Sequence, residues 1–491
     1  MSAGLASDLS PAPILDAVEN YRGSFVDLDR ATVVEAAAFA RGRTALTAQL
    51  RAEGLEAGDR VLVSIANGPR FPAALAALLA KDASPLLVHW QTPPQELLRT
   101  ARQFGARFVI SDGERLDEIS SMVGRSRTLS ADPWLNLSWA EVDATSPLYN
   151  DGMARVPGVP LHPTSGTTGR PKIAARPGFC ATEEARHYIE RIGIDENDVI
   201  LAAPPMSHAY AYGMCVMVPL LSGARVVSLR AFKPQPAQQA LQQFGVTIFP
   251  AVPAMLDLLL FGMPVSAVSS CRAVLSAGSP LPERTATRFQ KAYGASARPL
   301  YGTTETGGIS VGFADGQMRA GGAVGTAMAG VDVEVRPHPG AADIGAGMLS
   351  VRSSSMMAGY LDAGGIDDSP LVDGWFMTGD LARVGDDGEI RLLGRVTEVI
   401  NVSGMKVIPS EVEQVIAAVP GVVEVKVYPG RRKSGDQFVQ AALVLESGVP
   451  VQTIRTYCAE HLVYYKRPER MHILDALPRS PSGKIQVQQL P

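Results

Sequence analysis

The sequence is poor in cysteine, since its 491 residues include only Cys180, Cys215, Cys271 and Cys458. These four residues are far apart and form no Cys-x-x-Cys pair, so their spacing indicates neither a zinc site nor a disulfide framework. A chain without disulfides fits a reducing compartment. We therefore expect a cytoplasmic protein.

Long hydrophobic runs are also missing. The longest apolar stretches, such as residues 214–221, are far shorter than the roughly 20 residues that a membrane-spanning helix needs. The first residues, MSAGLASDLS, contain no basic segment followed by an apolar stretch, which a secretory leader requires. We expect neither an export signal nor a membrane span.

The chain has no large excess of charge of either sign. It carries 45 Lys and Arg against 49 Asp and Glu, a formal net charge of -4. The strong basic excess of a protein that coats nucleic acid is therefore absent, and we expect no nucleic-acid partner. Hydrophobic residues make up 46% of the chain and charged residues 19%, which is typical of a folded soluble protein. The length predicts at least two domains.

What the sequence does contain is a series of short apolar runs separated by stretches of helical composition. An Ala- and Leu-rich stretch at 71–81, for example, separates the first two runs. Such alternation predicts an α/β fold with much parallel sheet, whose ligands collect at the loops beyond the carboxyl ends of the strands. The predicted strands are 61–66, 86–89, 107–111, 199–203, 225–229, 246–250 and 273–277.

The pattern changes near residue 394. Two strands, at 422–428 and 438–446, follow a helix for which Ser410 and Glu413 form a candidate capping box. A further helix is expected at 451–463. These elements predict a small α+β domain, and we place the boundary between residues 1–394 and 395–491.

The sharpest local feature is the loop TSGTTGRPK at residues 164–172. Glycines let backbone N–H groups approach an anion, hydroxyls donate hydrogen bonds, and cations offset charge, so such a loop suits a polyphosphate. It has no Gly-Lys-Ser/Thr ending and is therefore not the loop of a P-loop NTPase. Taken alone, a run of Ser, Thr and Gly is more often a flexible surface loop.

This loop resembles the signature loop of the acyl-adenylate-forming superfamily, which includes acyl- and aryl-CoA synthetases, peptide-synthetase adenylation domains and beetle luciferases. Further motifs follow in the family's order and extend the resemblance over nearly the whole chain, closest to the stand-alone acyl- or aryl-CoA ligases. They are YGTTE at 301–305, TGD at 378–380, GR at 394–395, SGMK at 403–406 and PRSPSGK at 478–484.

The resemblance implies a large N-terminal domain of layered α/β subdomains that binds the acid and ATP, and a small mobile C-terminal domain that carries a catalytic lysine. It implies a reaction with ATP and Mg²⁺ that joins a small carboxylic acid to AMP, releases pyrophosphate and passes the acyl group to coenzyme A. An alternative acceptor, the phosphopantetheine of a carrier protein acting in trans, stays open, as does assembly into a homodimer.

The resemblance also assigns roles to single residues. Lys484 would stabilise the charge that builds up in the transition state, Asp380 would accept the ribose hydroxyls with help from Arg395, and Tyr301 would lie against the adenine or ribose. The implied catalytic residues are Lys484, His208, Thr304 and Glu305, and the implied magnesium ligands are Glu305 and Thr168. The implied nucleotide-binding residues are Thr164, Ser165, Gly166, Thr167, Thr168, Gly169, Lys172, Gly278, Ser279, Tyr301, Gly302, Thr303, Asp380 and Arg395.

The acid pocket is expected beside His208, with an aromatic or short to medium acyl acid as substrate. Members of the family that take α-amino acids carry a Phe-Asp pair here, and the Asp pairs with the ammonium group of the substrate. This chain has His208-Ala209 instead. Because a buried ammonium group without a counter-charge is costly, an α-amino acid substrate is disfavoured. The expected pocket wall is mostly apolar or small: Tyr210, Tyr212, Gly213, Val252, Met255, Ser276, Ala277 and Gly308.

The resemblance places the coenzyme A site in the C-terminal domain, at Gly404, Lys433 and Lys466. A side chain at position 404 would block the pantetheine tunnel. A solvated basic patch is the alternative interpretation of the two lysines. The sequence departs from the family at the hinge, where Thr397 replaces the usual Asp or Lys.

Overall fold

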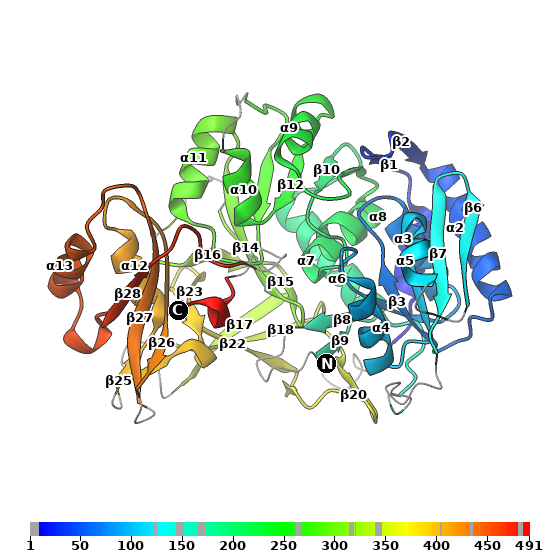
Figure 1. Cartoon of the computed structure of the whole chain (residues 1–491). Helices are drawn as coiled ribbons and strands as arrows, with labels where there is room; N and C mark the ends of the chain where they lie inside the picture. The colour runs from blue at the N-terminus through cyan, green and yellow to red at the C-terminus, as the bar shows by residue number, and fades with distance from the viewer. Residues whose placement is uncertain are drawn as a thin grey trace.

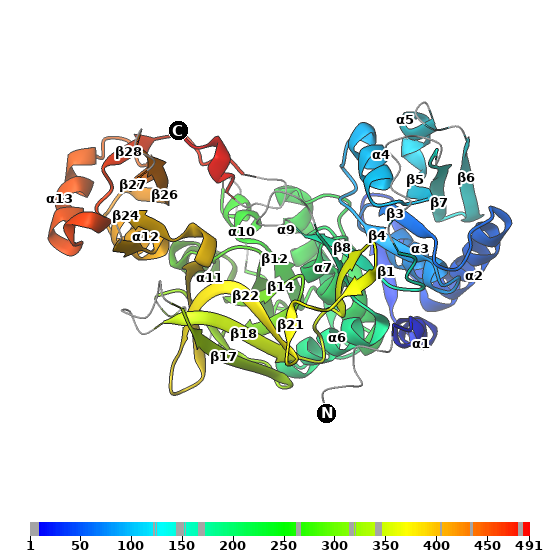
Figure 2. The same ribbon diagram turned by 90° about the horizontal axis from the view of Figure 1, so that it is seen from below.

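The computed structural model of the chain describes residues 9–120, 123, 125–143, 152, 154–164, 172–261, 267–313, 319, 321–338, 346–402, 405–432, 436–479 and 485–491. Figures 1 and 2 show the molecule from two directions. In both views the elements of the first 120 residues lie at one end, and the elements that follow residue 400 lie at the other.

One sheet has the strand order β20-β19-β9-β8-β4-β3-β5-β7-β6 and is parallel at its centre, in β4, β3 and β5. The central strand β3 is buried along its whole length, as expected for a parallel strand covered on both faces. The strands are β3 (Arg60–Ser64), β4 (Ser84–Leu87), β5 (Phe108–Asp112), β6 (Arg125–Asp132), β7 (Leu135–Glu141), β8 (Leu161–Thr164), β9 (Lys172–Ala175), β19 (Gly359–Asp362) and β20 (Gly365–Asp367).

The other large sheet has the order β17-β18-β22-β23-β16-β15-β14-β13-β12-β10-β11-β1-β2, with β21 beside β22. Its strands from β14 to β1 are parallel, and those from β15 to β17 are antiparallel. The strands are β1 (Ser24–Asp27), β2 (Thr32–Glu35), β10 (Val199–Ala202), β11 (Arg225–Ser228), β12 (Ile248–Ala251), β13 (Ala273–Ser276), β14 (Ala297–Thr303), β15 (Gly307–Val311), β16 (Ala323–Ala327), β17 (Val331–Pro337), β18 (Gly347–Ser353), β21 (Leu371–Val372), β22 (Trp375–Val384) and β23 (Glu389–Arg395).

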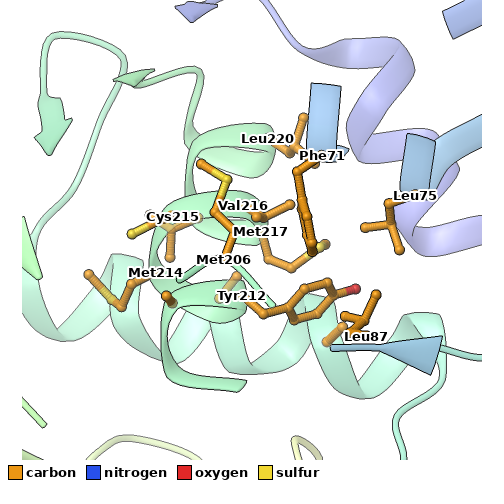
Figure 3. Packing of buried hydrophobic residues seen from close by; sticks show 14 of the residues in the cluster. Phe71, Leu75, Leu87, Met206, Tyr212, Met214, Cys215, Val216, Met217 and Leu220 are labelled. Carbon is orange, nitrogen blue, oxygen red and sulfur yellow. The ribbon is translucent and has the colours of Figure 1, made fainter. Parts of the chain in front are cut away.

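The helices that accompany these sheets form around apolar faces. In α3 every residue is buried, and Figure 3 shows Phe71 and Leu75 of this helix packed near Leu87 and Tyr212. The helices are α1 (Ala12–Asn20), α2 (Ala36–Ala52), α3 (Arg70–Leu79), α4 (Pro94–Gln103), α5 (Leu116–Ser120), α6 (Gly178–Ile192), α7 (Ala209–Tyr212), α8 (Val218–Ser222), α9 (Pro234–Gln243), α10 (Pro253–Leu259) and α11 (Glu283–Tyr293). A π-helical turn at Gly213–Met217 joins α7 to α8.

The predicted α/β class is confirmed. Each of the seven apolar runs coincides with a strand, namely β3, β4, β5, β10, β11, β12 or β13, and α3 occupies the Ala- and Leu-rich stretch between the first two. The parallel arrangement of these strands follows from the helices that connect them. Within the described residues, no helix is both long and apolar enough to cross a bilayer.

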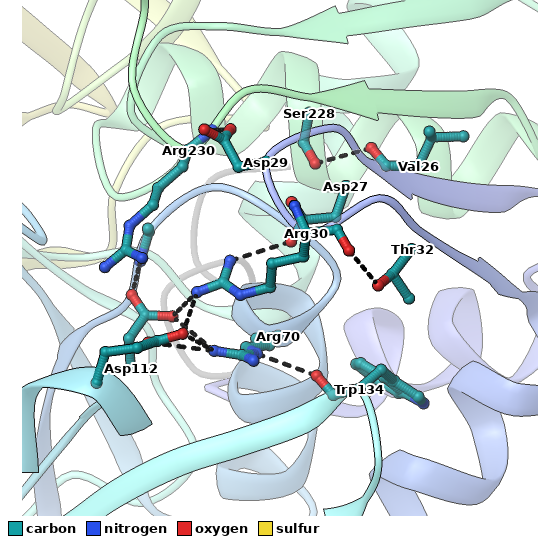
Figure 4. Close-up of polar contacts among 12 residues, drawn as sticks. Val26, Asp27, Asp29, Arg30, Thr32, Arg70, Asp112, Trp134, Ser228 and Arg230 are labelled. Atoms are coloured by element: carbon teal, nitrogen blue, oxygen red, sulfur yellow. Dashed lines mark hydrogen bonds and ion pairs between the residues drawn. The ribbon is translucent and has the colours of Figure 1, made fainter.

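Ion pairs to two buried carboxylates tie the two large sheets together (Figure 4). Arg30, which follows β1, donates to Asp27 at 3.1 Å and to Asp112 of β5 at 3.2 Å. Arg70 of α3 donates to the same Asp112 at 3.3 Å and to the carbonyl oxygen of Trp134 at 3.0 Å. Because Asp27 and Asp112 are both buried, each of their charges needs these partners.

The C-terminal elements have a hydrophobic core of their own, which includes Val412, Ile416, Val427, Leu443 and Ile454. They are β24 (Ile400–Val402), β25 (Met405–Val407), α12 (Pro409–Ala417), β26 (Val422–Arg431), β27 (Gln437–Leu445), α13 (Val451–His461) and β28 (Arg470–Ile473). The strands and helices expected here are thus present. The domain boundary between residues 394 and 395 stays a prediction.

The capping box expected at Ser410 is wrong. Helix α12 starts at Pro409, its N-cap residue is Ile408, and no side chain caps it. The hydroxyl of Ser410 instead donates to the carbonyl oxygen of Leu393, and Glu413 accepts a hydrogen bond of 2.8 Å from the backbone N–H of Val427. A proline at the first helical position has its φ fixed in the helical range and leaves no N–H to satisfy, so the helix starts without a cap.

Candidate active site

The predicted motifs follow the carboxyl ends of parallel strands. His208 comes after β10, Gly278 after β13 and Thr304 after β14. Because these strands belong to one parallel part of the sheet, in the order β10-β12-β13-β14, their carboxyl ends share one edge. Strands β8 and β9 form a hairpin in which Thr164 lies opposite Lys172, so the ends of the TSGTTGRPK loop are held side by side.

Asp380 is the centre of a polar cluster made by three motifs. It lies opposite Arg395 in the ladder of β22 and β23, and Arg395 Nε is 2.7 Å from Asp380 Oδ1. The hydroxyl of Tyr301, on β14, donates to Asp380 Oδ2 at 2.6 Å. Burial raises the pKa of Asp380 above its usual range, although Arg395 and Tyr301 oppose this effect. The cluster thus presents a carboxylate whose position is fixed from two sides.

Glu305 belongs to a second chain of contacts. Its Oε1 accepts a hydrogen bond of 2.8 Å from the hydroxyl of Tyr360 on β19. Lys172 Nζ lies over the ring of Tyr360, 4.6 Å from the ring centroid, a distance at which a cation is attracted to an aromatic face. The predicted metal ligand and the predicted phosphate-binding lysine therefore share one aromatic neighbour.

A tight turn shapes the loop between Tyr301, which contacts Asp380, and Glu305, which contacts Tyr360. The hydroxyls of Thr303 and Thr306 are 3.1 Å apart, and the N–H of Thr306 donates to Thr303 Oγ1 at 3.2 Å. Gly302 must lack a side chain because a Cβ there would lie 2.3 Å from the carbonyl oxygen of Gly307. Gly307 itself has a φ of +71°, which disfavours other residues. The turn directs Thr304 and Glu305 outward, and both are only partly buried.

A fully buried ion pair contacts the end of this loop at Gly308. Arg176 Nη2 lies 2.8 Å from Glu184 Oε2, with side-chain exposures of 0% and 1%. Glu184 Oε1 accepts hydrogen bonds from the Tyr188 hydroxyl at 2.9 Å and from the Gly308 N–H at 3.1 Å. Arg176 also donates to the carbonyl oxygen of Ser355 at 3.0 Å. These contacts fix the backbone at the end of the Tyr301–Gly308 loop.

A cavity of about 170 Å³ lies beside Thr304. Its wall includes His89, which follows β4, His162 of β8, and His208, which precedes α7. The rings of His89 and His208 are 5.9 Å apart between centroids. Apolar groups of Leu87 and of neighbouring residues complete the wall. Thr304 of the YGTTE motif and three histidines therefore line one cavity.

The other residues expected in the acid pocket are not among the described lining residues of this cavity. Tyr210 donates to the carbonyl oxygen of Leu275 at 2.6 Å, and Tyr212 is fully buried. A Cβ at Gly308 would lie 2.5 Å from the ring of Tyr188, so packing explains that glycine. A Cβ at Gly213 would likewise come close to Glu184 and Tyr188. Val252 is partly buried, and three others are buried, namely Met255, Ser276 and Ala277. Their role in binding the acid stays a prediction.

Several predicted residues fall outside the described part of the chain, and their roles stay predictions. They are Ser165, Gly166, Thr167, Thr168 and Gly169 of the signature loop, Gly404 and Lys433 of the expected coenzyme A site, and Lys484.

The remaining predicted residues have plain surroundings. Gly278 is exposed with a φ of +85°, and Ser279 follows it in the same loop. Lys466 Nζ forms an ion pair of 2.6 Å with Glu411 of α12, which gives this lysine a structural partner. Thr397 is exposed in a single 3₁₀ turn, Val396–Glu398, between β23 and β24. Short 3₁₀ turns are frequent as connectors between other elements.

Sequence reasoning missed four residues of this site: His162, Arg176, Glu184 and Tyr360. Tyr360 stands in the sequence Ala-Gly-Tyr-Leu, where an aromatic residue is equally typical of a buried strand. Arg176 and Glu184 are a charged pair eight residues apart, across a strand end and a helix. A charge in an apolar stretch was the available signal, because a buried charge needs a partner or a function.

Comparisons with known proteins identify the family and the fold. Residues 36–361 match the family described as AMP-binding enzyme, and residues 411–484 match its C-terminal domain. A 4-coumarate–CoA ligase of Pinus taeda is 26% identical over 470 residues, covering 88% of this chain and 84% of the relative. ScoC, a fatty acid–[acyl-carrier-protein] ligase of Streptomyces coeruleorubidus, is 27% identical over 458 residues, covering 89% and 87%. The crystal structure of ATP-bound MatB from Rhodopseudomonas palustris matches with a TM-score of 0.82 at 23% identity, covering 99% of this chain and 98% of that one, which shows a shared fold.

Proposed function

The chain belongs to the family of AMP-binding enzymes, and from this premise we propose that it activates a small carboxylic acid as an acyl-adenylate and transfers the acyl group to coenzyme A. The observation that carries the proposal is the convergence of separate motifs. Asp380 contacts both Tyr301 and Arg395, while Glu305, four residues after Tyr301, reaches Lys172 through Tyr360. The carboxylates of Asp380 and Glu305 are also near enough to interact electrostatically, which supports one nucleotide site for these groups.

In the first half of the proposed reaction, an oxygen of the acid's carboxylate attacks the innermost phosphorus of ATP. A bond from that oxygen to phosphorus forms, and the bond to pyrophosphate breaks. Asp380 accepts hydrogen bonds from the ribose hydroxyls, and Tyr301 and Arg395 hold its carboxylate in place. Lys172 and Lys484 reduce the repulsion between the carboxylate and the phosphates.

The residues present fit a magnesium ion. Within the part of the chain that the structure describes, no three His, Cys, Asp or Glu side chains cluster closely enough to hold a metal by themselves. Glu305 offers one partly exposed carboxylate, and magnesium in nucleotide sites is typically bound by one or two carboxylates together with the phosphates. When bound, magnesium neutralises charge on the phosphates. Tyr360 orients the Glu305 carboxylate toward this role.

In the second half, the sulfur of the thiol attacks the acyl carbon, the bond to AMP breaks, and the thiol proton passes to solvent. The C-terminal domain, residues 395–491, would first rotate about the 3₁₀ turn at Thr397. The separate core of this domain and the short turn that joins it to β23 support such a rotation.

An acid-dependent pyrophosphate-exchange screen tests the proposal. The panel contains benzoates, arylalkanoates, short and medium fatty acids, and β-amino acids, each with ATP and Mg²⁺. At least one acid class is expected to support exchange, and the Glu305→Gln variant is expected to lose most of it. If none of these acids supports pyrophosphate exchange by the wild-type protein, the proposal is contradicted.

Two variants separate the proposed roles. Lys484→Ala should slow pyrophosphate formation by orders of magnitude but spare thioester formation from pre-made acyl-AMP, and an equal loss in both assays would refute the role of Lys484. His208→Ala should change the affinity or the rate for the acid while ATP binding stays nearly intact. A collapse of ATP affinity would instead make His208 a structural residue.

A carrier protein is the second candidate for the acceptor, favoured by the 27% identity to an acyl-carrier-protein ligase. Its phosphopantetheine ends in the same thiol as coenzyme A, so the chemistry of transfer is shared. Incubation with acid, ATP and either coenzyme A or a phosphopantetheinylated carrier protein distinguishes the two acceptors. The homodimer and the cytoplasmic location stay predictions.

A further inference from the structure

Most arginines that lie over an aromatic ring in the described residues also have a carboxylate partner. Arg352, for example, lies over Trp375 at 4.7 Å from the ring centroid and pairs with Asp332 at 2.9 Å. The others paired in this way are Arg107, Arg319, Arg336 and Arg432. Within the described residues, the ring-bound cations without a carboxylate at ion-pair distance are Lys172, Arg230 and Arg470.

The charge of Arg230 is therefore held in the same way as that of Lys172, the predicted phosphate-binding lysine. Its guanidinium carbon lies 4.8 Å from the ring centroid of Trp90. The guanidinium donates to no group in the part of the chain that the structure describes, and its nitrogens are not among the buried polar atoms there, so they reach solvent. Asp29 accepts a hydrogen bond of 2.6 Å from the backbone N–H of Arg230, whereas the side chain of Arg230 extends away from Asp29 (Figure 4).

The turn that carries Trp90 is fixed by several hydrogen bonds. Arg115 donates to the carbonyl oxygen of Trp90 and, at 2.8 Å, to that of Thr92. The carbonyl oxygen of His89 accepts from the Thr92 N–H at 3.0 Å and from the Ser64 hydroxyl at 3.3 Å. Trp90 itself is half-buried, and its indole nitrogen is not among the buried unpartnered atoms. A surface that is already ordered loses little entropy when a ligand binds.

Trp90 and Arg230 come from the two large sheets. Trp90 follows β4 of one sheet and Arg230 follows β11 of the other, each beyond the carboxyl end of a parallel strand, where ligands of such sheets collect. The ring of Trp90 lies 6.3 Å from that of His89, and His89 lines the cavity beside Thr304. The pair therefore adjoins the wall of the candidate active-site cavity.

The donors of this pair suit a phosphate. A guanidinium and an indole N–H only donate hydrogen bonds, a phosphate oxygen accepts them, and hydrogen bonds between charged groups are the strong ones. In the proposed reaction the phosphates of ATP meet Lys172 and Lys484. The thiol acceptor also carries a phosphate, on its pantetheine arm, and Lys466, one of the lysines expected to meet it, is already paired with Glu411.

We infer that Trp90 and Arg230 bind the phosphate of the acceptor's phosphopantetheine arm, whose thiol end enters the cavity. This phosphate is common to coenzyme A and to a carrier protein. The inference rests on the acyl transfer proposed above and adds an N-terminal part of the acceptor site. It gives Trp90 and Arg230 no part in the bond-making steps.

Binding can be measured without turnover, because Trp90 is itself fluorescent. In the presence of AMP, coenzyme A should quench the tryptophan fluorescence of the wild type saturably, and pantetheine, which lacks the phosphate, should bind at least about fivefold more weakly. Arg230→Gln should raise the Kd for coenzyme A about fivefold to twentyfold, through the loss of hydrogen bonds to a charged group, and leave the Kd for pantetheine unchanged. Arg230→Lys should keep part of the preference, because it keeps the charge without the planar guanidinium. Trp90→Phe should remove most of the quenching.

Arg352→Gln is the matched control, because Arg352 lies over Trp375 at nearly the same distance but pairs with Asp332. It should leave the quenching and both Kd values unchanged. In steady-state thioester formation, Arg230→Gln should raise the KM for coenzyme A, while the KM for ATP changes less than about twofold. A phosphopantetheinylated carrier protein should show the same rise in KM if it is an acceptor. With a carrier that accepts the acyl group, an effect on coenzyme A alone would place Arg230 at the nucleotide end of that molecule and overturn the assignment to the arm.

The remaining outcomes separate this inference from the proposed function. No quenching by coenzyme A, an equal loss of affinity for coenzyme A and pantetheine in Arg230→Gln, or a loss of ATP affinity instead would overturn the inference. Pyrophosphate exchange with some acid but an unchanged Kd for coenzyme A in Arg230→Gln would overturn the inference alone. Failure of exchange with every acid would overturn the acid-activating function, while quenching by coenzyme A that is lost in Trp90→Phe would still identify the phosphate site.

Discussion

The hydroxyl of Tyr301 donates a hydrogen bond of 2.6 Å to Asp380 Oδ2, which joins two residues 79 positions apart in the chain. The same carboxylate meets Arg395 at 2.7 Å. Asp380 therefore keeps only part of its hydrogen-bonding capacity for a ligand, and that part is oriented by two neighbours.

Replacing Asp380 with Asn should weaken nucleotide binding. An amide cannot accept two hydrogen bonds from a ribose diol with full carboxylate strength, so the KM for ATP should rise roughly tenfold to hundredfold. Steady-state pyrophosphate release at varied ATP measures this effect. Asp332→Asn is the control, because Asp332 pairs with Arg352 on the surface with both side chains more than half exposed, at 60% and 53%. An equal rise in both variants would argue against the role of Asp380.

Replacing Tyr360 with Phe should disturb Glu305 without removing its charge. The variant loses the hydrogen bond of 2.8 Å to Glu305 but keeps the ring under Lys172. We expect the Mg²⁺ concentration for half-maximal activity to rise about threefold to tenfold, since a mutated orienting partner of a metal ligand typically costs about 10- to 100-fold at a dedicated metal site. Tyr293→Phe, which removes a hydroxyl bonded to the carbonyl oxygen of Leu259, controls for hydroxyl loss. If both variants respond to Mg²⁺ alike, Tyr360 does not orient Glu305.

Replacing Arg176 with Met should destabilise the protein strongly. The change leaves the charge of Glu184 buried without its partner at 2.8 Å, and such a loss typically costs about 3–5 kcal/mol. The double variant Arg176→Met/Glu184→Gln should recover much of this, because an amide oxygen still accepts from Tyr188 and Gly308. Urea unfolding measures the free energies. The exposed ion-pair variant Arg352→Met should cost less than about 1 kcal/mol, and a similar cost at Arg176 would show that burial does not matter there.

Replacing Gly308 with Ala should also destabilise the loop. The new methyl group would lie 2.5 Å from the ring of Tyr188, and overpacking of this kind typically costs about 1–3 kcal/mol. The double variant Gly308→Ala/Tyr188→Leu should relieve part of the clash. Gly364→Ala, where the nearest atom is 3.4 Å away, serves as the control in thermal unfolding. Equal Tm values for the two single variants would contradict the packing argument.

Asp198 should contribute to stability in a pH-dependent way. Burial raises its pKa, but hydrogen bonds from Arg272 and Thr247 outweigh burial and leave the pKa below the usual value. A lowered pKa means that the unfolded chain binds more protons, so this stabilisation is complete above the ordinary Asp pKa of about 3.9 and is lost as the pH falls through the folded-state pKa.

Asp198→Asn should therefore lower the free energy of unfolding by about 1.5–3 kcal/mol at pH 7, the typical value for hydrogen bonds to a charged group. The difference from the wild type should shrink as the pH approaches 3. Urea unfolding at several pH values measures it. A difference that stays constant, or grows, toward low pH would contradict the assigned direction of the pKa shift.

Much of the fold could be predicted because local patterns agree with the tertiary structure. The run at 61–66 is apolar except for Ser64, and strand β3 is buried throughout. The resemblance to the family also implied that Asp380 and Arg395 belong to one site. The two residues lie directly opposite each other because of the register of β22 and β23. The ladder of these strands contains a register shift after Leu381, so counting residues along the sequence does not give this pairing.

The rest depended on partners that only the tertiary structure supplies. His162 stands in the sequence Leu-His-Pro, and nothing local shows that β8 places it in a cavity wall with His208. The capping box at Ser410 failed for the same reason, because a distant carbonyl at Leu393 captures its hydroxyl. A sequence pattern shows which hydrogen-bonding groups a residue has, whereas the tertiary structure determines which partner each group contacts.

The hydrophobic core around α12, α13 and β27 takes all of its buried members from residues 400–462, and only the turn Val396–Glu398 and Val399 separate this region from β23. A protease that cuts within that turn would therefore release a fragment with an intact core, which should resist further digestion. The nicked body would retain Tyr301, Asp380 and Arg395, and with them the contacts proposed to bind a nucleotide, after removal of Lys484, the lysine proposed to be catalytic.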